Sequence, residues 1–96
     1  MTILGLNHLA NFARKHPDTR SALGAFQREV EGAKWTDPSQ LKARYPRSSF
    51  VGKDNVVFDI RGGNYRLHAR VSYEMQILIV VRIGTHAEYD RWTFDQ

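Results

Sequence analysis

The apolar residues of this chain change their spacing once, at Pro46, and that change constrains the fold more than any other feature. Before Pro46 they recur every three or four residues, as on a helix with one buried face. After it they recur every second residue, which is the period of a strand. A helical half followed by a strand half predicts the α+β class. With 96 residues, 42% of them hydrophobic, the chain suffices for a single domain over residues 1–96.

The first half predicts three helices. The face of the first is formed by Leu6, Leu9, Ala10 and Ala13. A second helix, with Asp18 as its N-cap and Gly32 at its end, should form a hairpin with the first. Asp37, followed by a proline and by Gln40, is expected to cap a short third helix that ends before Pro46. Residues 1–4 are a candidate edge strand.

The second half predicts an antiparallel meander covered by the helices on one face. Residues 56–60 alternate, and the following "GGN" favours a hairpin turn. In the next strand, residues 65–73, one face is apolar and the other is polar, with Arg66, His68 and Arg70. The segment "QILIVVRIG" is apolar on both sides, as expected of a central strand that is covered on both faces for most of its length.

A short C-terminal helix is predicted in "GTHAEYDRW", residues 84–92. Thr85 and Glu88 have the spacing of a capping box, which would start the helix at His86. On that helix His86, Tyr89 and Asp90 stand at i, i+3 and i+4 and therefore share a face. Free backbone N–H groups at the start of a helix attract phosphate. The stretch is thus a candidate proton-transfer cluster beside an anion site.

A purely structural interpretation of these residues is also open. The same spacing occurs in helix turns that only pack against a sheet, with the aspartate paired to a surface arginine, and Glu88 is favoured as a capping partner alone. His8 and His16 are interpreted as surface residues. His68 either touches a ligand or faces solvent. The aromatic residues expected to pack in the fold, rather than stack on bases, are Trp35, Trp92 and Phe94.

The charge distribution favours nucleic acid as the partner. The formal net charge is +4, and the segment from Lys42 to Arg70 alone holds seven cations and two anions. Ten of the 14 basic residues are arginine, whose planar guanidinium suits phosphate and stacks on bases. A membrane surface is less favoured, because no basic amphipathic helix with bulky apolar residues is apparent.

Several classes of chemistry lose support. Cysteine is absent, so there is neither a disulfide nor a thiolate zinc site. No motif for a bound metal, a nucleotide cofactor or an acyl-serine mechanism occurs, and we expect no cofactor. No run approaches the roughly 20 apolar residues of a membrane-spanning helix, and the amino terminus lacks a signal pattern, so we expect a cytoplasmic protein.

Two blocks, "RYPRSSFVGKDNVVFDIRGGNYRLHARV" and "GTHAEYD", resemble the HigB toxins of bacterial type II toxin–antitoxin systems, a branch of the RelE/ParE fold group. The likeness extends from about Trp35 to Trp92. It implies a RelE-like sheet with helices on one face and a concave, basic opposite face that receives RNA. It also implies an endoribonuclease that cuts mRNA on translating ribosomes and is neutralised by a helix-turn-helix, HigA-like antitoxin.

The resemblance carries over residue by residue. The motif positions match Arg66, His86, Tyr89 and Asp90, which become the catalytic candidates. The candidate RNA contacts are Lys53, Arg61, Asn64, His68, Arg70 and Arg82. One position departs from the family, in which an arginine commonly lies five residues before the motif histidine, because Val81 holds that place here. A one-residue shift turns a strand side chain to the opposite face, so either a bulge restores the aim of Arg82 or this residue does another job.

Metal-independent RNA cleavage is the function we favour on this basis. His86, assisted or replaced by Tyr89, would transfer protons, Arg66 and Arg70 would hold the scissile phosphate, and Asp90 would orient a neighbour. Two alternatives stay open. One is a non-enzymatic toxin of the same fold that binds DNA gyrase, and the other is a simple RNA-binding module in which His86 only packs.

Overall fold

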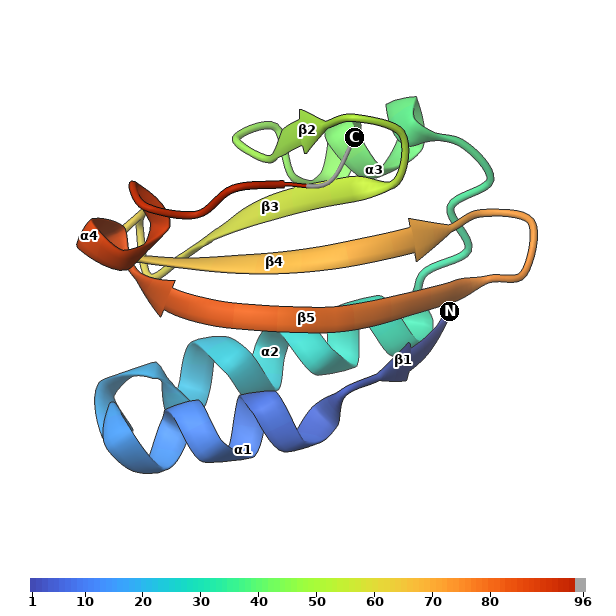
Figure 1. Cartoon of the computed structure of the whole chain (residues 1–96). Coiled ribbons are helices and arrows are strands. Elements are labelled where there is room, and N and C mark those ends of the chain that lie inside the picture. Colours follow the sequence, from blue (N-terminus) through green and yellow to red (C-terminus); the bar gives the residue numbers. More distant parts are fainter. Residues whose placement is uncertain (95–96) are drawn as a thin grey trace.

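The structure is a computed structural model, and it describes residues 1–94. Four α-helices, one short 3-10 helix and five strands follow one another in the described part of the chain (Figure 1). Their bounds are β1 (Thr2–Leu4), α1 (Leu6–Lys15), η1 (Pro17–Thr19), α2 (Arg20–Gly32), α3 (Pro38–Arg44), β2 (Ser49–Val51), β3 (Asn55–Ile60), β4 (Tyr65–Ser72), β5 (Ile77–Thr85) and α4 (His86–Tyr89).

The five strands form one sheet in the order β1-β5-β4-β3-β2. Strands β3 to β5 make the predicted antiparallel meander, and β2, which was not predicted, adds a further antiparallel strand to it. The candidate edge strand is present and pairs with β5 in parallel, Thr2 opposite Ile77 and Leu4 opposite Ile79, so the sheet is mixed. Helices α1 and α2 lie side by side on one side of the sheet (Figure 1). The predicted α+β class, with an N-terminal helical hairpin and a short C-terminal helix, is confirmed.

The helix ends agree with the sequence in one case and differ in another. Asp37 caps α3 as predicted, because its side chain accepts a hydrogen bond from the Gln40 backbone N–H at 3.0 Å. The prediction that Asp18 caps the second helix was wrong. Asp18 lies in η1, α2 begins two residues later, and the Asp18 carboxylate accepts hydrogen bonds from Arg61 and from the Tyr65 hydroxyl, each at 2.8 Å. Because its carboxylate is engaged in this tertiary contact, Asp18 does not cap α2.

The core lies between the helices and one face of the sheet. Alternate residues of β1, β3, β4 and β5 supply it, as the period of two requires. Phe58 of β3, Leu67 of β4 and Leu78 of β5 are fully buried there. The fully buried helical residues that meet them include Val30 and Leu41.

Strand β5 contains a bulge. His68 and Ala69 are adjacent on β4, but their partners on β5 are Arg82 and Val80, so Val81 is an extra residue. We expected this strand to be covered on both faces, but only the face toward the core is covered. On the opposite face Ile79 is 43% exposed. The bulge exchanges the two faces of β5 beyond Val81.

The turn between β1 and α1 depends on Gly5, and this gives a stability prediction. Gly5 has φ of +82°, and a Cβ there would lie 2.6 Å from the Val80 carbonyl oxygen. We expect Gly5→Ala to lower the free energy of unfolding by roughly 2–5 kcal/mol, because a left-handed alanine costs about 1–2 kcal/mol and overpacking typically adds about 1–3 kcal/mol. Urea denaturation measures the change.

Gly32→Ala is the matched control. Gly32 ends α2, and a Cβ there meets nothing within 4 Å. Its unfolding free energy should be unchanged or raised by up to about 1 kcal/mol. Equal effects of the two substitutions would show that the junction at Gly5 does not constrain the fold.

Candidate active site

Helix α4 is held at its start by the predicted capping box. The Thr85 hydroxyl accepts a hydrogen bond from the Glu88 backbone N–H at 3.2 Å, and the Glu88 carboxylate accepts one from the Thr85 N–H at 2.8 Å. The second bond is the main reason that the pKa of Glu88 is lowered. These two residues therefore hold the helix turn, and they leave its other polar side chains available for chemistry.

Two residues of α4, His86 and Tyr89, form the predicted cluster with Asp90 at the C-cap of the helix. His86 Nδ1 lies 3.4 Å from Asp90 Oδ2, and both side chains are exposed. The ring of Tyr89 stands edge-on to that of His86, with 6.4 Å between centroids. An imidazole whose Nδ1 faces a carboxylate presents Nε2 to solvent, which is the arrangement that orients a histidine for proton transfer.

Arg66 reaches this cluster from β4. Its guanidinium carbon lies 5.3 Å from the centroid of the Tyr89 ring. Its Nε lies 3.2 Å from Asp59 Oδ1, and a terminal nitrogen donates to the Gly63 carbonyl oxygen. Only 15% of the side chain is exposed, so its position is well constrained. The structure thus brings together all four catalytic candidates, where the start of β4 meets the end of β5.

Asp59 was not among the residues predicted for the site. A signal for it was present, because a four-residue turn over residues 61–64 pairs Ile60 with Tyr65 and therefore Asp59 with Arg66. Asp59 shares the polar face of the sheet with Arg66, and its carboxylate determines which way the guanidinium points.

His68 does not face solvent. The residue is 5% exposed and lies between Asn55 and Arg82. Because Arg82 Nε donates to His68 Nδ1 at 3.1 Å, the ring proton is on Nε2, which donates to Asn55 Oδ1 at 2.8 Å. Burial, followed by the nearby charges of Arg82 and Arg70, lowers the pKa of His68 to about 4. His68 is therefore neutral at physiological pH.

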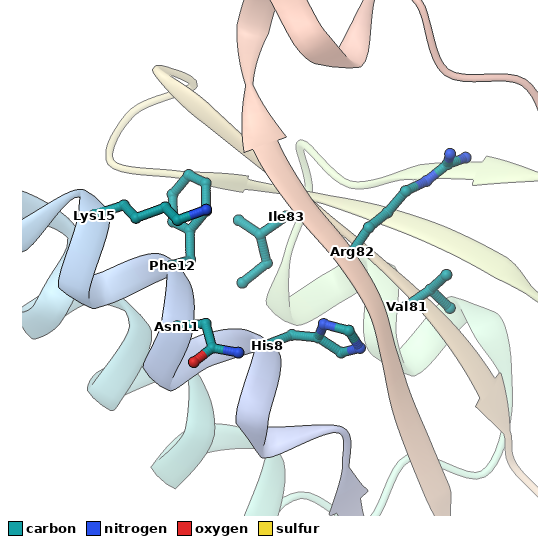
Figure 2. A pocket seen from close by; sticks show the side chains of 7 residues that line it. All are labelled: His8, Asn11, Phe12, Lys15, Val81, Arg82 and Ile83. Carbon is teal, nitrogen blue, oxygen red and sulfur yellow. The ribbon is translucent and has the colours of Figure 1, made fainter.

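The bulge turns the Arg82 side chain to the polar face of the sheet. Without it Arg82 would follow Leu78 and Val80 into the core, but with it Arg82 lies opposite His68 on the polar face. Figure 2 shows the result, with Ile83 pointing toward Phe12 of α1 and Arg82 pointing away from that helix.

The C-terminal segment, residues 91–94, covers the middle of the polar face. It turns back from α4 along the sheet (Figure 1), and the Thr93 carbonyl accepts a hydrogen bond from Arg82 at 2.8 Å. The Arg82 guanidinium lies 4.5 Å from the centroid of Trp92 and 5.2 Å from that of Phe94. The prediction that both aromatic residues pack within the fold is confirmed. They separate Arg66 at one end of β4 from Arg70 at the other.

The remaining predicted RNA contacts are dispersed. Arg70 is exposed and lies 3.7 Å from Asp54, which lies with Lys53 in the β2–β3 turn. Asn64 is close to the catalytic candidates, because its carbonyl oxygen accepts from the His86 N–H at 3.3 Å. Arg61 is paired with Asp18 in η1, toward the helices.

A pocket of about 220 Å³ lies between α1 and β5, and the sequence did not indicate it (Figure 2). Its lining residues are His8, Asn11, Phe12, Lys15, Val81, Arg82 and Ile83. His8 is exposed, as predicted, whereas His16 is half-buried and stacks on Phe12 with 4.3 Å between ring centroids. No catalytic candidate lines this pocket, so it is separate from the cluster on α4.

Within residues 1–94, no group of three or more histidine or acidic side chains is arranged to hold a metal ion. Over the same residues, no helix is both long and apolar enough to cross a membrane.

The fold and the site define a small α+β protein with a histidine, tyrosine and aspartate cluster beside an arginine, at one end of a basic sheet face. Residues 19–92 match the family model described as HigB toxin, the RelE-like toxic component of a toxin-antitoxin system. The chain belongs to the HigB toxin family.

Curated relatives agree with this family. An mRNA interferase toxin HigB of Escherichia coli K12 is 30% identical over 95 residues, which cover 97% of this chain and 91% of the relative. An mRNA interferase HigB of Escherichia coli O6:H1, strain CFT073, is 29% identical over 83 residues, covering 84% and 81% of the two chains. A Shigella flexneri mRNA interferase HigB is 30% identical over 95 residues, with coverage of 97% and 91%.

The buried neutral His68 gives a pH prediction. Its pKa in the fold is about 4, below the ordinary 6.5, so between these values the unfolded chain binds a proton that the folded chain does not. Stability should therefore fall as the pH falls from 6.5 to 4, by up to about 1.4 kcal/mol per pH unit from this group.

Urea denaturation at several pH values between 7 and 4 measures this slope. In His68→Gln the slope of the unfolding free energy against pH should be shallower by up to about 1.4 kcal/mol per pH unit, whatever the stability of the variant at pH 7. His8→Gln, which changes an exposed histidine, is the control and should keep the slope of the wild type. An unchanged slope in His68→Gln would mean that His68 is not held neutral by the fold.

Proposed function

We propose that this chain is an mRNA-cleaving toxin, a metal-independent endoribonuclease that inhibits growth by cutting messages during translation. The observation that carries the proposal is the contact of His86 with Asp90 beside Tyr89 and Arg66, at one end of a basic sheet face. Membership of the HigB toxin family and relatives named mRNA interferases support it.

The side chains provide for each step of RNA cleavage by the 2′-hydroxyl. His86 Nε2 takes the 2′-hydroxyl proton as the oxygen attacks the phosphorus, and a cyclic phosphate forms as the bond to the 5′ oxygen breaks. Tyr89 assists or replaces His86 in moving the proton to that leaving oxygen. Asp90 orients the imidazole through Nδ1. Arg66 balances the negative charge that develops on the phosphorane.

Arg70 takes a different role from the one expected for it. Four residues along a strand separate the Cα atoms of Arg66 and Arg70 by about 13 Å. Their side chains also diverge, Arg66 toward Asp59 near the end of β3 and Arg70 toward Asp54 just before its start. In this proposal Arg66 alone contacts the scissile phosphate. Arg70 and Lys53 contact other phosphates of the same RNA strand, which runs along β4.

The proposed partners are mRNA, the ribosome and a helix-turn-helix, HigA-like antitoxin, in the bacterial cytoplasm. Family membership supports the antitoxin. Dependence on the ribosome fits a site with one exposed imidazole, because a ribosome that positions the message supplies the orientation that such a small site lacks.

The proposal predicts new 5′ ends of mRNA after brief induction of the protein in a bacterium. These ends should lie inside reading frames, in a fixed codon register, and should be absent after His86→Ala. His8→Ala, which removes an exposed histidine of α1, should cut as the wild type does. Circular dichroism of the purified variants checks that their fold is kept.

The other outcomes separate the alternative functions. Growth arrest without new mRNA ends, but with DNA damage, would favour a gyrase-binding toxin. An unchanged phenotype and unchanged RNA affinity in His86→Ala would favour a simple RNA-binding module. Either result would contradict RNA cleavage by this cluster.

Arg66→Ala tests charge stabilisation separately. Removing a group that stabilises transition-state charge costs about 10²–10³-fold in rate, so cutting should fall by that factor. Arg28→Ala is the matched control, because Arg28 is an exposed arginine on α2 and its loss changes the net charge equally. Equal cutting by the two variants would remove Arg66 from the site. The measurement is the rate at which reporter mRNA is cut in a translation extract.

A further inference from the structure

One carboxylate joins two arginines beside the candidate active site. Asp59 Oδ1 lies 3.2 Å from Arg66 Nε, and Asp59 Oδ2 lies 3.3 Å from Arg47 Nε. A Cβ at Gly63 would lie 3.4 Å from a terminal nitrogen of Arg66 and 3.6 Å from one of Arg47, so the two guanidinium groups converge. One carboxylate between two guanidinium groups leaves a net positive charge at this point.

The two arginines differ in freedom. The Arg66 side chain is 15% exposed, whereas that of Arg47 is 71% exposed. An exposed ion pair contributes little to stability, so Arg47 can leave Asp59 for a phosphate at small cost. Asp59 then still holds Arg66. Arg44, in the same segment, is bound to Glu29 through both Nε and a terminal nitrogen and is less available.

A pocket of about 260 Å³ opens next to Arg47. It is lined by residues 44–48 together with Asp59 and Gly62. Strand β2 pairs only with residues 55–57 of β3, so the pocket lies beside the part of β3 that extends beyond β2. Asp59 belongs both to this pocket and to the arginine pair, which places the pocket next to Arg66.

The lining suits one nucleotide of a single strand. Tyr45 supplies an aromatic ring that the core holds in place, through contacts with Phe26 and Phe58 at 6.0 and 5.2 Å between centroids. Aromatic rings and arginines together are what proteins use to bind single-stranded nucleic acid. The volume is below the usual 300–1,000 Å³ of small-molecule pockets and fits a single base.

We propose that this pocket is a nucleotide subsite, which takes the base of a nucleotide adjoining the scissile phosphate of an RNA strand, while Arg47 binds the next phosphate of that strand. The inference rests on the proposed function and deepens it. It gives Arg47 a binding role at the phosphate next to the scissile one, and it makes Asp59 a positioning residue that holds Arg66 on the scissile phosphate.

The test compares Arg47→Ala with Arg28→Ala, an equal loss of charge on the exposed surface of α2. The first measurement is 5′-end mapping of mRNA after induction of the wild type and of each variant. Wild type and Arg28→Ala should show the same base preference around the cut. Arg47→Ala should still cut, because His86 and Arg66 remain, but at least 10-fold less often, and the preference at one position adjoining the cut should flatten.

The second measurement is the affinity for a short single-stranded RNA at several salt concentrations, with His86→Ala added to every protein so that the RNA stays intact. Loss of one phosphate contact should make the plot of log affinity against log salt shallower by about 0.7 in Arg47→Ala. Arg28→Ala should leave the slope unchanged.

The outcomes distinguish this inference from the proposed function. If the wild type cuts mRNA but Arg47→Ala matches Arg28→Ala in cut preference and in salt slope, the subsite is rejected and the proposed function stands. If the wild type makes no new ends, the proposed function fails and the subsite fails with it.

Discussion

The bulge at Val81 in β5 is the constraint on which the polar face of the sheet depends. Before it, alternate residues of β5 face the helices, and after it the alternation is reversed. The reversal puts Arg82, a cation that would be costly to bury in the core, beside His68. Arg82 in turn holds the C-terminal segment through a carbonyl oxygen and two aromatic rings. One extra residue thus gives the polar face an ordered cover.

An ion pair lies at each end of this face. At one end Asp59 fixes Arg66, which lies over the ring of Tyr89, and Tyr89 in turn contacts His86. At the other end Asp54 faces Arg70. Arg66 and Arg70 each lie near a carboxylate, so the face is less uniformly positive than a count of arginines suggests. A phosphate that binds there competes with an existing ion pair, which favours the exposed arginines because their ion pairs are weak.

Much of the fold was predictable, because local patterns decide it. The change of period at Pro46, the cap at Asp37 and the capping box of α4 each involve residues close in sequence, and each prediction was confirmed. The cluster on α4 was predictable for the same reason. Asp18 was predicted wrongly because contacts 43 and 47 residues away compete with a helix cap. The strand β2 was missed, since three residues are too few to show a period.

The sequence by itself determined the α+β class, the helix ends with local caps and the shared face of His86, Tyr89 and Asp90. The reason is that these depend on spacing within one or two turns of chain. Tertiary structure alone decided that Asp59 holds Arg66, that His68 is buried and neutral, and that Arg82 faces away from the core. Those outcomes require strand register and a folded C-terminal segment, which bring together side chains that no local pattern relates.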